Sequence, residues 1–133
     1  MREASPFSYA LLRLVPRVER GERLNVGIVL FSAGAGYLGA RTTLDTVRAA
    51  ALWPELDLKP VRAHLVAVEG VAAGDPSYGP IARLPTSARF HWLVAPSSTI
   101  IQPSAVHTGI CDDPPARLDR LFETLVEVPR ATS

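Results

Sequence analysis

Residues 7–31, FSYALLRLVPRVERGERLNVGIVLF, decide the fold of this chain. Two apolar runs, residues 7–15 and 24–31, flank a segment that carries charges, a proline and a glycine. Short runs rich in β-branched and aromatic residues are typical of strands that are buried on both faces. Residues 16–23 include five ionised side chains, which must lie at the surface because an unpaired charge is costly to bury. The stretch therefore predicts two central strands of a sheet, joined by a charged loop at one end.

The pattern within these two strands is more specific. From Phe7 to Val15 the odd-numbered residues share one face and the even-numbered residues share the other, and both faces are largely apolar. Gly27 lies inside the second strand, where it adds no side chain to pack. Glycine at such a position indicates a bulge or the close approach of another segment.

Three further strands are predicted from alternating apolar residues. Residues 37–42 follow a flexible turn and should return beside the second strand as a hairpin. Residues 90–95 place Phe90 on one face with the residues at 92 and 94, and predict a fourth strand. Residues 100–107 predict a fifth strand, which Pro103 restricts to a sheet edge or a bulge because proline has no N–H to donate.

Three helices are predicted, at residues 43–52, 57–74 and 113–129, from apolar residues at helical spacing. Thr43, Asp57 and Asp113 are their expected N-caps, because short polar side chains accept hydrogen bonds from the first helical N–H groups. Between the second helix and the fourth strand, the chain has too many glycines and prolines for a regular element, and we expect a long loop.

The order of these elements is βββααββα. It predicts a single α+β domain over residues 1–133, with a mixed or antiparallel sheet of about five strands and helices packed on it. A chain of 133 residues with 47% hydrophobic and 20% charged residues is long enough and apolar enough for one core. Residues 1–6 and 129–133 are expected to be loose ends.

Composition limits the classes of function. The net charge is +1, which argues against a nucleic-acid-binding surface, and all basic residues except Lys59 are arginine, as a GC-rich genome would produce. A single cysteine, Cys111, excludes an internal disulfide and a cysteine-rich zinc site, and fits a reducing compartment. The sequence has no apolar signal core and no membrane-length apolar run, so we expect a cytoplasmic protein without membrane contact.

One candidate site groups Arg13, Arg17, Glu22 and Asn25 around the end of the first strand and the start of the second. Arg13 lies in an apolar strand, and so needs a partner or a wet pocket. An ion pair with Glu22 that pins the loop, with Asn25 capping a turn, is the simpler interpretation. The alternative is a site for an anion, since guanidinium groups match phosphate and carboxylate.

A second candidate site groups Arg89, His91, Ser97 and Ser98 on the predicted fourth strand and the turn after it. Alternation would place Arg89 and His91 on one face, and consecutive hydroxyls in a turn can present donors to phosphate. The simpler interpretation of the two serines is that they form the turn by bonding their own backbone.

No catalytic or metal motif is evident. The three histidines, His64, His91 and His107, have neither HxH nor HExxH spacing, so no metal site is predicted. There is no GxSxG elbow, and Cys111 precedes two aspartates that disfavour its thiolate. We therefore expect no catalytic residue and no cofactor.

Four segments, at residues 9–16, 21–31, 89–98 and 118–126, resemble the bacterial domain-of-unknown-function 3037 family. The resemblance covers nearly the whole chain. It implies no particular activity, but proteins of this family are often encoded beside a HipA-like kinase, which suggests a partner.

These observations predict a non-catalytic accessory or protein-interaction domain that partners a HipA-like kinase. The surfaces expected to bind are the edge strand at residues 100–107 and the loop at residues 17–23. The alternative is a small anion- or nucleotide-binding domain, or a phosphoryl-handling enzyme, that uses a pocket of arginine and histidine. Both are compatible with a homo-oligomer, and nucleic-acid binding is the third and weakest hypothesis.

Overall fold

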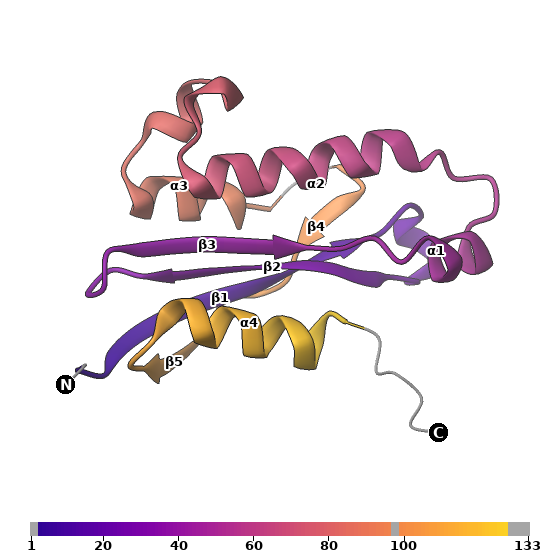
Figure 1. Ribbon diagram of the computed structural model, residues 1–133. Coiled ribbons are helices and arrows are strands. Elements are labelled where there is room, and N and C mark those ends of the chain that lie inside the picture. The colour runs from indigo at the N-terminus through magenta and orange to yellow at the C-terminus, as the bar shows by residue number, and fades with distance from the viewer. Residues whose placement is uncertain (1–2, 97–98, 128–133) are drawn as a thin grey trace.

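The computed structural model describes residues 3–96 and 99–127 (Figure 1). Within these residues the chain forms one five-stranded sheet and four α-helices in the order βββαααββα. The strands are β1 (Ser5–Leu14), β2 (Leu24–Ser32), β3 (Tyr37–Thr42), β4 (Ile101–Pro103) and β5 (His107–Cys111). The helices are α1 (Thr46–Leu52), α2 (Leu58–Ala73), α3 (Thr86–Leu93) and α4 (Pro114–Leu125), with short 3₁₀ turns η1 (Val18–Arg20), η2 (Pro76–Tyr78) and η3 (Pro80–Arg83). The predicted α+β class is confirmed.

The first strand, β1, is the centre of the sheet. It pairs with β2 on one side, and on the other side its two halves pair with β5 and β4. β3 pairs with β2 and forms the opposite edge. All of these pairings are antiparallel, so the antiparallel form of the predicted sheet is the one observed.

Helices cover both faces of the sheet (Figure 1). Leu12 and Leu14 of β1 lie in a core that also includes buried residues of α1, α2 and α3. Phe7 and Leu11, which alternate with them, lie in a second core that is closed by α4. The prediction that both faces of the first two strands are buried is confirmed. It follows from the apolar side chains at odd-numbered and even-numbered positions alike.

A bulge in β2 changes which residues face which core. Leu12 pairs with Gly27 and Arg13 pairs with Asn25, so Val26 has no partner position on β1. Before the bulge the even-numbered residues of β2 face the core of α1 to α3, and after it the odd-numbered residues do. This confirms the bulge that was one of the two interpretations of Gly27.

Helix caps explain where the helices begin. The carboxylate of Asp57 accepts from the Lys59 N–H and so caps α2, as predicted. The expected start of the first helix at Thr43 is wrong, because α1 begins at Thr46 behind Asp45. The Thr43 N–H instead donates to the Val26 carbonyl at 2.9 Å, which extends the β2–β3 ladder by one bond.

The predicted fourth strand at residues 90–95 is wrong, because most of it belongs to the helix α3. Phe90 and Leu93 are buried at a spacing of three residues, which places both on one face of a helix, while Trp92 is 52% exposed. The loop predicted before it contains η2, η3 and the first turn of α3.

Of the predicted fifth strand at residues 100–107, only Ile101–Pro103 form a strand, β4, while β5 begins at His107 and runs beyond the predicted end to Cys111. Ser104 lies between them and is held to the central strand, because its N–H donates to the Leu11 carbonyl and its hydroxyl accepts from the Leu11 N–H. Both strands lie at the sheet edge, as Pro103 indicated. The last helix begins behind Asp113 as expected and ends at Leu125, and Pro129 lies outside the described residues.

Candidate functional site

The two predicted anion sites do not come together. Arg13 lies on β1 at a position that faces α4, because its neighbours Leu12 and Leu14 belong to the core on the other face. Arg89 and His91 lie on α3, which packs on that other face. The sheet therefore separates the two groups.

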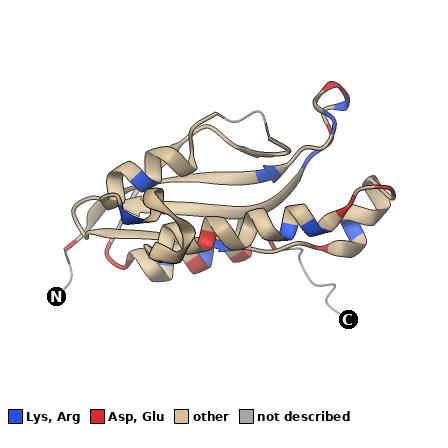
Figure 2. Cartoon of the chain, turned by 90° about the horizontal axis from the view of Figure 1, so that it is seen from above, with Lys and Arg blue, Asp and Glu red and all other residues tan. Residues whose placement is uncertain are grey.

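The predicted ion pair between Arg13 and Glu22 is wrong. Glu22 accepts a hydrogen bond from the Nε of Arg20, two residues earlier, which lowers the pKa of the Glu22 carboxyl. Both residues belong to the charged loop between β1 and β2, which projects from one end of the molecule (Figure 2). Arg17 is exposed on the same loop, where it lines a hollow beside Trp53.

Asn25 does not cap a local turn, as expected, but joins the sheet to the last helix. Its Nδ2 donates to the carbonyl of Leu125, the last residue of α4, at 3.0 Å. The partner is 100 residues away in the chain, so no local sequence pattern could have indicated it.

The second predicted group is held by structural contacts. Arg89 donates to the carbonyls of Ala82 and Leu84, at 3.4 and 3.0 Å, and so fixes η3 against α3. The Nδ1 of His91 lies 2.8 Å from the Ser87 carbonyl, one helical turn earlier. Positions two apart on a helix point about 160° apart, so α3 directs Arg89 and His91 to different sides. Ser97 and Ser98 lie outside the described residues.

Among the residues that the structure describes, no group of three or more histidine, cysteine, aspartate or glutamate side chains could hold a metal ion. Cys111 is a free, buried thiol at the end of β5. His107 packs its ring against Tyr9, with centroids 5.3 Å apart. In the same described part of the chain, no helix is both long and apolar enough to span a bilayer.

A groove with a volume of about 680 Å³ runs along β3. Its floor is the edge of the strand, and α2 and α4 rise on either side of it (Figure 1). Within the described ranges, β2 is the only strand that pairs with β3. We call this feature the β3 groove, and its lining includes Tyr37, Arg41, Glu69, Asp75 and Asp119.

The register defines which backbone groups of β3 face the groove. The bond from Thr43 to Val26 makes that pair a hydrogen-bonded one, and hydrogen-bonded and non-bonded pairs alternate along an antiparallel ladder. Leu38, Ala40 and Thr42 are therefore the residues whose N–H and C=O groups point away from β2. They form a row of three donors and three acceptors along the open edge of β3, with Leu38 and Ala40 in the lining of the groove and Thr42 just beyond it.

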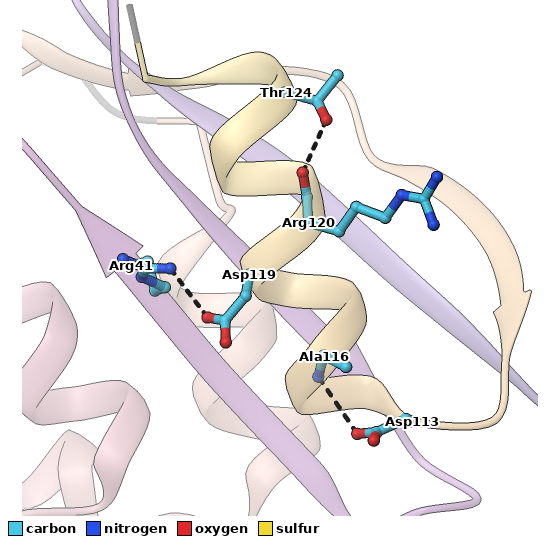
Figure 3. Close-up of polar contacts among 6 residues, drawn as sticks. All are labelled: Arg41, Asp113, Ala116, Asp119, Arg120 and Thr124. Carbon is cyan, nitrogen blue, oxygen red and sulfur yellow. Dashed lines mark hydrogen bonds and ion pairs between the residues drawn. The ribbon is translucent and has the colours of Figure 1, made fainter.

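One wall of the β3 groove is fixed by a contact between β3 and α4. Arg41 extends from the strand to the helix, where its Nη1 donates to Asp119 Oδ1 at 3.0 Å (Figure 3). The same guanidinium lies over the Phe122 ring, 4.2 Å from its centroid. An arginine that bonds a carboxylate and covers an aromatic face loses much of its freedom, so this wall is ordered before any partner arrives.

The groove has an acidic character. Glu69, Asp75 and Asp119 contribute three carboxylates to its lining, and Arg41 contributes the single guanidinium, which Asp119 engages. Glu69 accepts a hydrogen bond from the Thr42 hydroxyl, and Asp75 accepts from the N–H and hydroxyl of Ser77, so both keep their negative charge without a cationic partner among the described residues. Burial raises the pKa of the Tyr37 phenol, and the nearby carboxylate of Asp119 raises it further. The groove therefore favours a cationic occupant.

The opposite edge is less suited to bind another strand. β4 and β5 are short, with three and five residues, and Pro103 removes one backbone donor. Natural proteins protect sheet edges by such means. The edge that was expected to bind, at residues 100–107, is therefore the more protected of the two.

Sequence reasoning identified β3 with its correct bounds but not its place in the sheet. The signal that was available is the hairpin between β2 and β3, which shows that one side of β3 is paired. Only the strand order shows that the other side is open.

A two-sided antiparallel sheet with three helices on one face and one on the other defines the chain as an α+β protein. A model of the family described as "Protein of unknown function (DUF3037)" matches residues 9–126, and the chain belongs to this family. The resemblance drawn from the sequence is thus confirmed. No curated protein and no solved structure matches the chain.

Proposed function

We propose that this protein is a non-catalytic interaction domain that binds an extended segment of a partner protein as an additional strand on β3. The observation that carries the proposal is the row of outward-facing backbone groups at Leu38, Ala40 and Thr42, which lies between two helical walls. A peptide that pairs with an open edge gains main-chain hydrogen bonds, and the walls beside the edge select its side chains.

The charge of the groove specifies the kind of segment. Glu69 and Asp75 lie on the side of α2, and Asp119 lies on the side of α4. An extended peptide directs successive side chains to opposite faces, so lysine or arginine at alternating positions would reach either wall. The preferred segment is therefore a basic one, and complementary charge would also speed its encounter with the groove.

The partner we propose is a HipA-like kinase, in keeping with the gene neighbourhood that the family resemblance implies. On this proposal the protein is a bacterial, cytoplasmic accessory protein, and the kinase supplies the extended basic segment. The loop at residues 17–23, which projects from one end of the molecule (Figure 2), is a second surface that we propose the kinase contacts.

The alternative function, an anion- or nucleotide-binding domain or phosphoryl-handling enzyme with one arginine and histidine pocket, has less support. The sheet separates Arg13 from Arg89 and His91, and Arg17 lies on the exposed loop. The buried Nε of Arg13, which has no partner among the described residues, favours a smaller anion site around this arginine.

The test is binding of the purified chain to the neighbouring kinase, measured by size-exclusion chromatography and by amide hydrogen exchange. We expect a stable complex at micromolar concentrations, with slower exchange at the N–H groups of Leu38, Ala40 and Thr42. Two proteins that stay separate would refute the partnership. A complex that leaves these three amides unprotected would refute the site.

Two variants probe the groove separately. Ala40→Pro removes an outward donor without removing a bond to β2, and Glu69→Lys reverses one wall charge. Each should weaken binding about tenfold or more, the equivalent of one charge-assisted or backbone hydrogen bond. Glu123→Lys makes the same charge change on the exposed side of α4, outside the groove, and should bind like the wild type.

A further inference from the structure

A row of polar side chains crosses three strands on the face of the sheet that α4 covers. Arg13 of β1 pairs with Asn25 of β2 on one side and with Gln102 of β4 on the other. The adjacent row, Leu24, Leu14 and Ile101, lies in the core of α1 to α3. Because side chains alternate along each strand, Asn25, Arg13 and Gln102 must face the other way.

The helix α4 ends beside this row, which is half-buried. The bond from Asn25 to the Leu125 carbonyl places the last turn of α4 over one end of the row. Arg13 and Gln102 continue the row beyond the helix and are half-buried. The row is therefore partly open to solvent, with the end of α4 beside Asn25.

A second arginine lies next to Arg13. Arg23 is exposed and directly precedes Leu24, the first residue of β2, which pairs with Leu14 next to Arg13. The charge of Arg23, after burial, is the second cause that lowers the pKa of the Arg13 guanidinium. Two like charges therefore lie at this end of the β1–β2 pair.

Neither arginine is neutralised by a described residue. No hydrogen bond or ion pair joins the Arg13 or Arg23 side chain to any other residue within 3–96 and 99–127, and the Nε of Arg13 is buried without a partner. Glu22, the nearest acid in sequence, is engaged by Arg20. Glu127 lies past the end of α4, where it lines a hollow with Asp45, Arg48 and Asn25, and no ion pair joins it to Arg13 or Arg23.

We propose that Arg13 and Arg23, with the amides of Asn25 and Gln102, form a binding site for an oxyanion group, a phosphate or a carboxylate, carried by a small ligand. Each guanidinium offers a planar fork of donors that matches two oxygens of such a group. A bound anion removes the repulsion between the two arginines, which the unliganded protein must otherwise tolerate. Two positive charges match a dianionic phosphate best.

The two amides add neutral donors to the site. Gln102 Nε2 makes a hydrogen bond of 3.3 Å to the Thr99 carbonyl, which is long enough to be exchanged for a better acceptor. Asn25 keeps one Nδ2 hydrogen on Leu125 and has a second hydrogen for a ligand. None of these four residues lines the β3 groove, so this site is independent of the proposed partner site.

Isothermal titration calorimetry of the full chain with inorganic pyrophosphate, and separately with succinate, tests the proposal at low ionic strength. We expect one binding site, and Arg13→Gln or Arg23→Gln should each raise the Kd about tenfold or more, as loss of a charge-assisted contact does. Arg62→Gln is the matched control, because it removes the same charge from the exposed side of α2 and should leave the Kd unchanged within about twofold.

Each outcome decides the proposal. Arginine-dependent binding of pyrophosphate alone identifies a phosphate-bearing ligand, and binding of succinate alone identifies a carboxylate-bearing one. If neither probe binds at millimolar concentrations, the proposed site is refuted. It is also refuted if Arg62→Gln raises the Kd as much as Arg13→Gln or Arg23→Gln does. Arg23 is exposed, so Arg23→Gln decides the question even where Arg13→Gln fails to fold. Without a ligand, Arg23→Gln should unfold at the same temperature as the wild type or higher.

Discussion

Replacing Gly27 by alanine adds one methyl group at the bulge of β2. An ideal Cβ at this position would lie 3.0 Å from Thr42 Cγ2, 3.1 Å from the Arg41 carbonyl oxygen and 3.4 Å from Leu12 Cδ1. The first and third of these atoms end side chains and can shift slightly. The Arg41 carbonyl belongs to the β2–β3 ladder and cannot shift without weakening the pairing.

The expected loss of stability follows from these distances. Adding a methyl group to a packed interior costs about 1–3 kcal/mol, because neighbours must move or leave their preferred rotamers. Alanine also restricts the unfolded chain, which returns about 0.4–1 kcal/mol. We therefore expect Gly27→Ala to lower the free energy of unfolding by about 1–2 kcal/mol, with a fall in Tm of about 3–10 °C.

Gly34→Ala is the matched control. Gly34 lies in the exposed β2–β3 turn, where a Cβ would meet Ser5 at an ordinary contact distance of 3.4 Å. The same chemical change there should leave stability unchanged or raise it by up to about 1 kcal/mol. Urea unfolding followed by circular dichroism measures both variants. If Gly27→Ala is as stable as Gly34→Ala, the bulge is not packed as described and the reasoning fails.

Three further changes test the packing and the pH response. Asn25→Ala should cost about 1 kcal/mol of unfolding free energy because it leaves the Leu125 carbonyl without its donor, and unchanged urea unfolding would contradict that role. Phe122→Ala removes a buried ring from the core under α4 and should cost about 3–5 kcal/mol, whereas Glu123→Ala on the exposed side should stay within about 0.5 kcal/mol in the same assay. Burial lowers the pKa of His64, so the unfolded state takes up its proton first as the pH falls below 6.5, and stability should decline there. A stability–pH curve for His64→Gln should lack this decline, and identical curves for both proteins would refute it.

The central strands of the sheet could be predicted because both their odd-numbered and their even-numbered residues are mostly apolar. The first two strands are buried on both faces, and no other element could bury so many alternating side chains in runs this short. The capping aspartates Asp57 and Asp113 were equally informative, because their hydrogen bonds are local. The first two strands and the two helices that these aspartates cap are confirmed, because patterns of neighbouring residues are enough to specify them.

The error at α3 has a physical cause. A run of six residues with Phe90, Trp92 and Val94 satisfies a period of two, but Phe90 and Leu93 also satisfy a helical spacing. The structure buries the second pair and exposes Trp92 to 52%. So short a run cannot distinguish the two periods, and packing against α2 and the sheet decides between them.

The candidate sites depend on strand order, which the sequence does not contain. Arg13 and Asn25 could be grouped because the hairpin between β1 and β2 brings them together. Arg23 could have joined them, since it shares the parity of Asn25. Gln102 could not, because it reaches Arg13 only through the pairing of β1 with β4, about 90 residues later in the chain.

The central position of β1 has a consequence for synthesis of the protein. Of the five strands of the sheet, β1 is the first to be synthesised and also the one whose second edge is closed last, by β4 and β5. Until α4 emerges, the apolar face that holds Phe7 and Leu11 has no cover. The nascent chain must therefore keep an open strand edge and a bare apolar face through most of translation, the kind of exposure that recruits chaperones. The fold can close only when β4, β5 and α4 have been made.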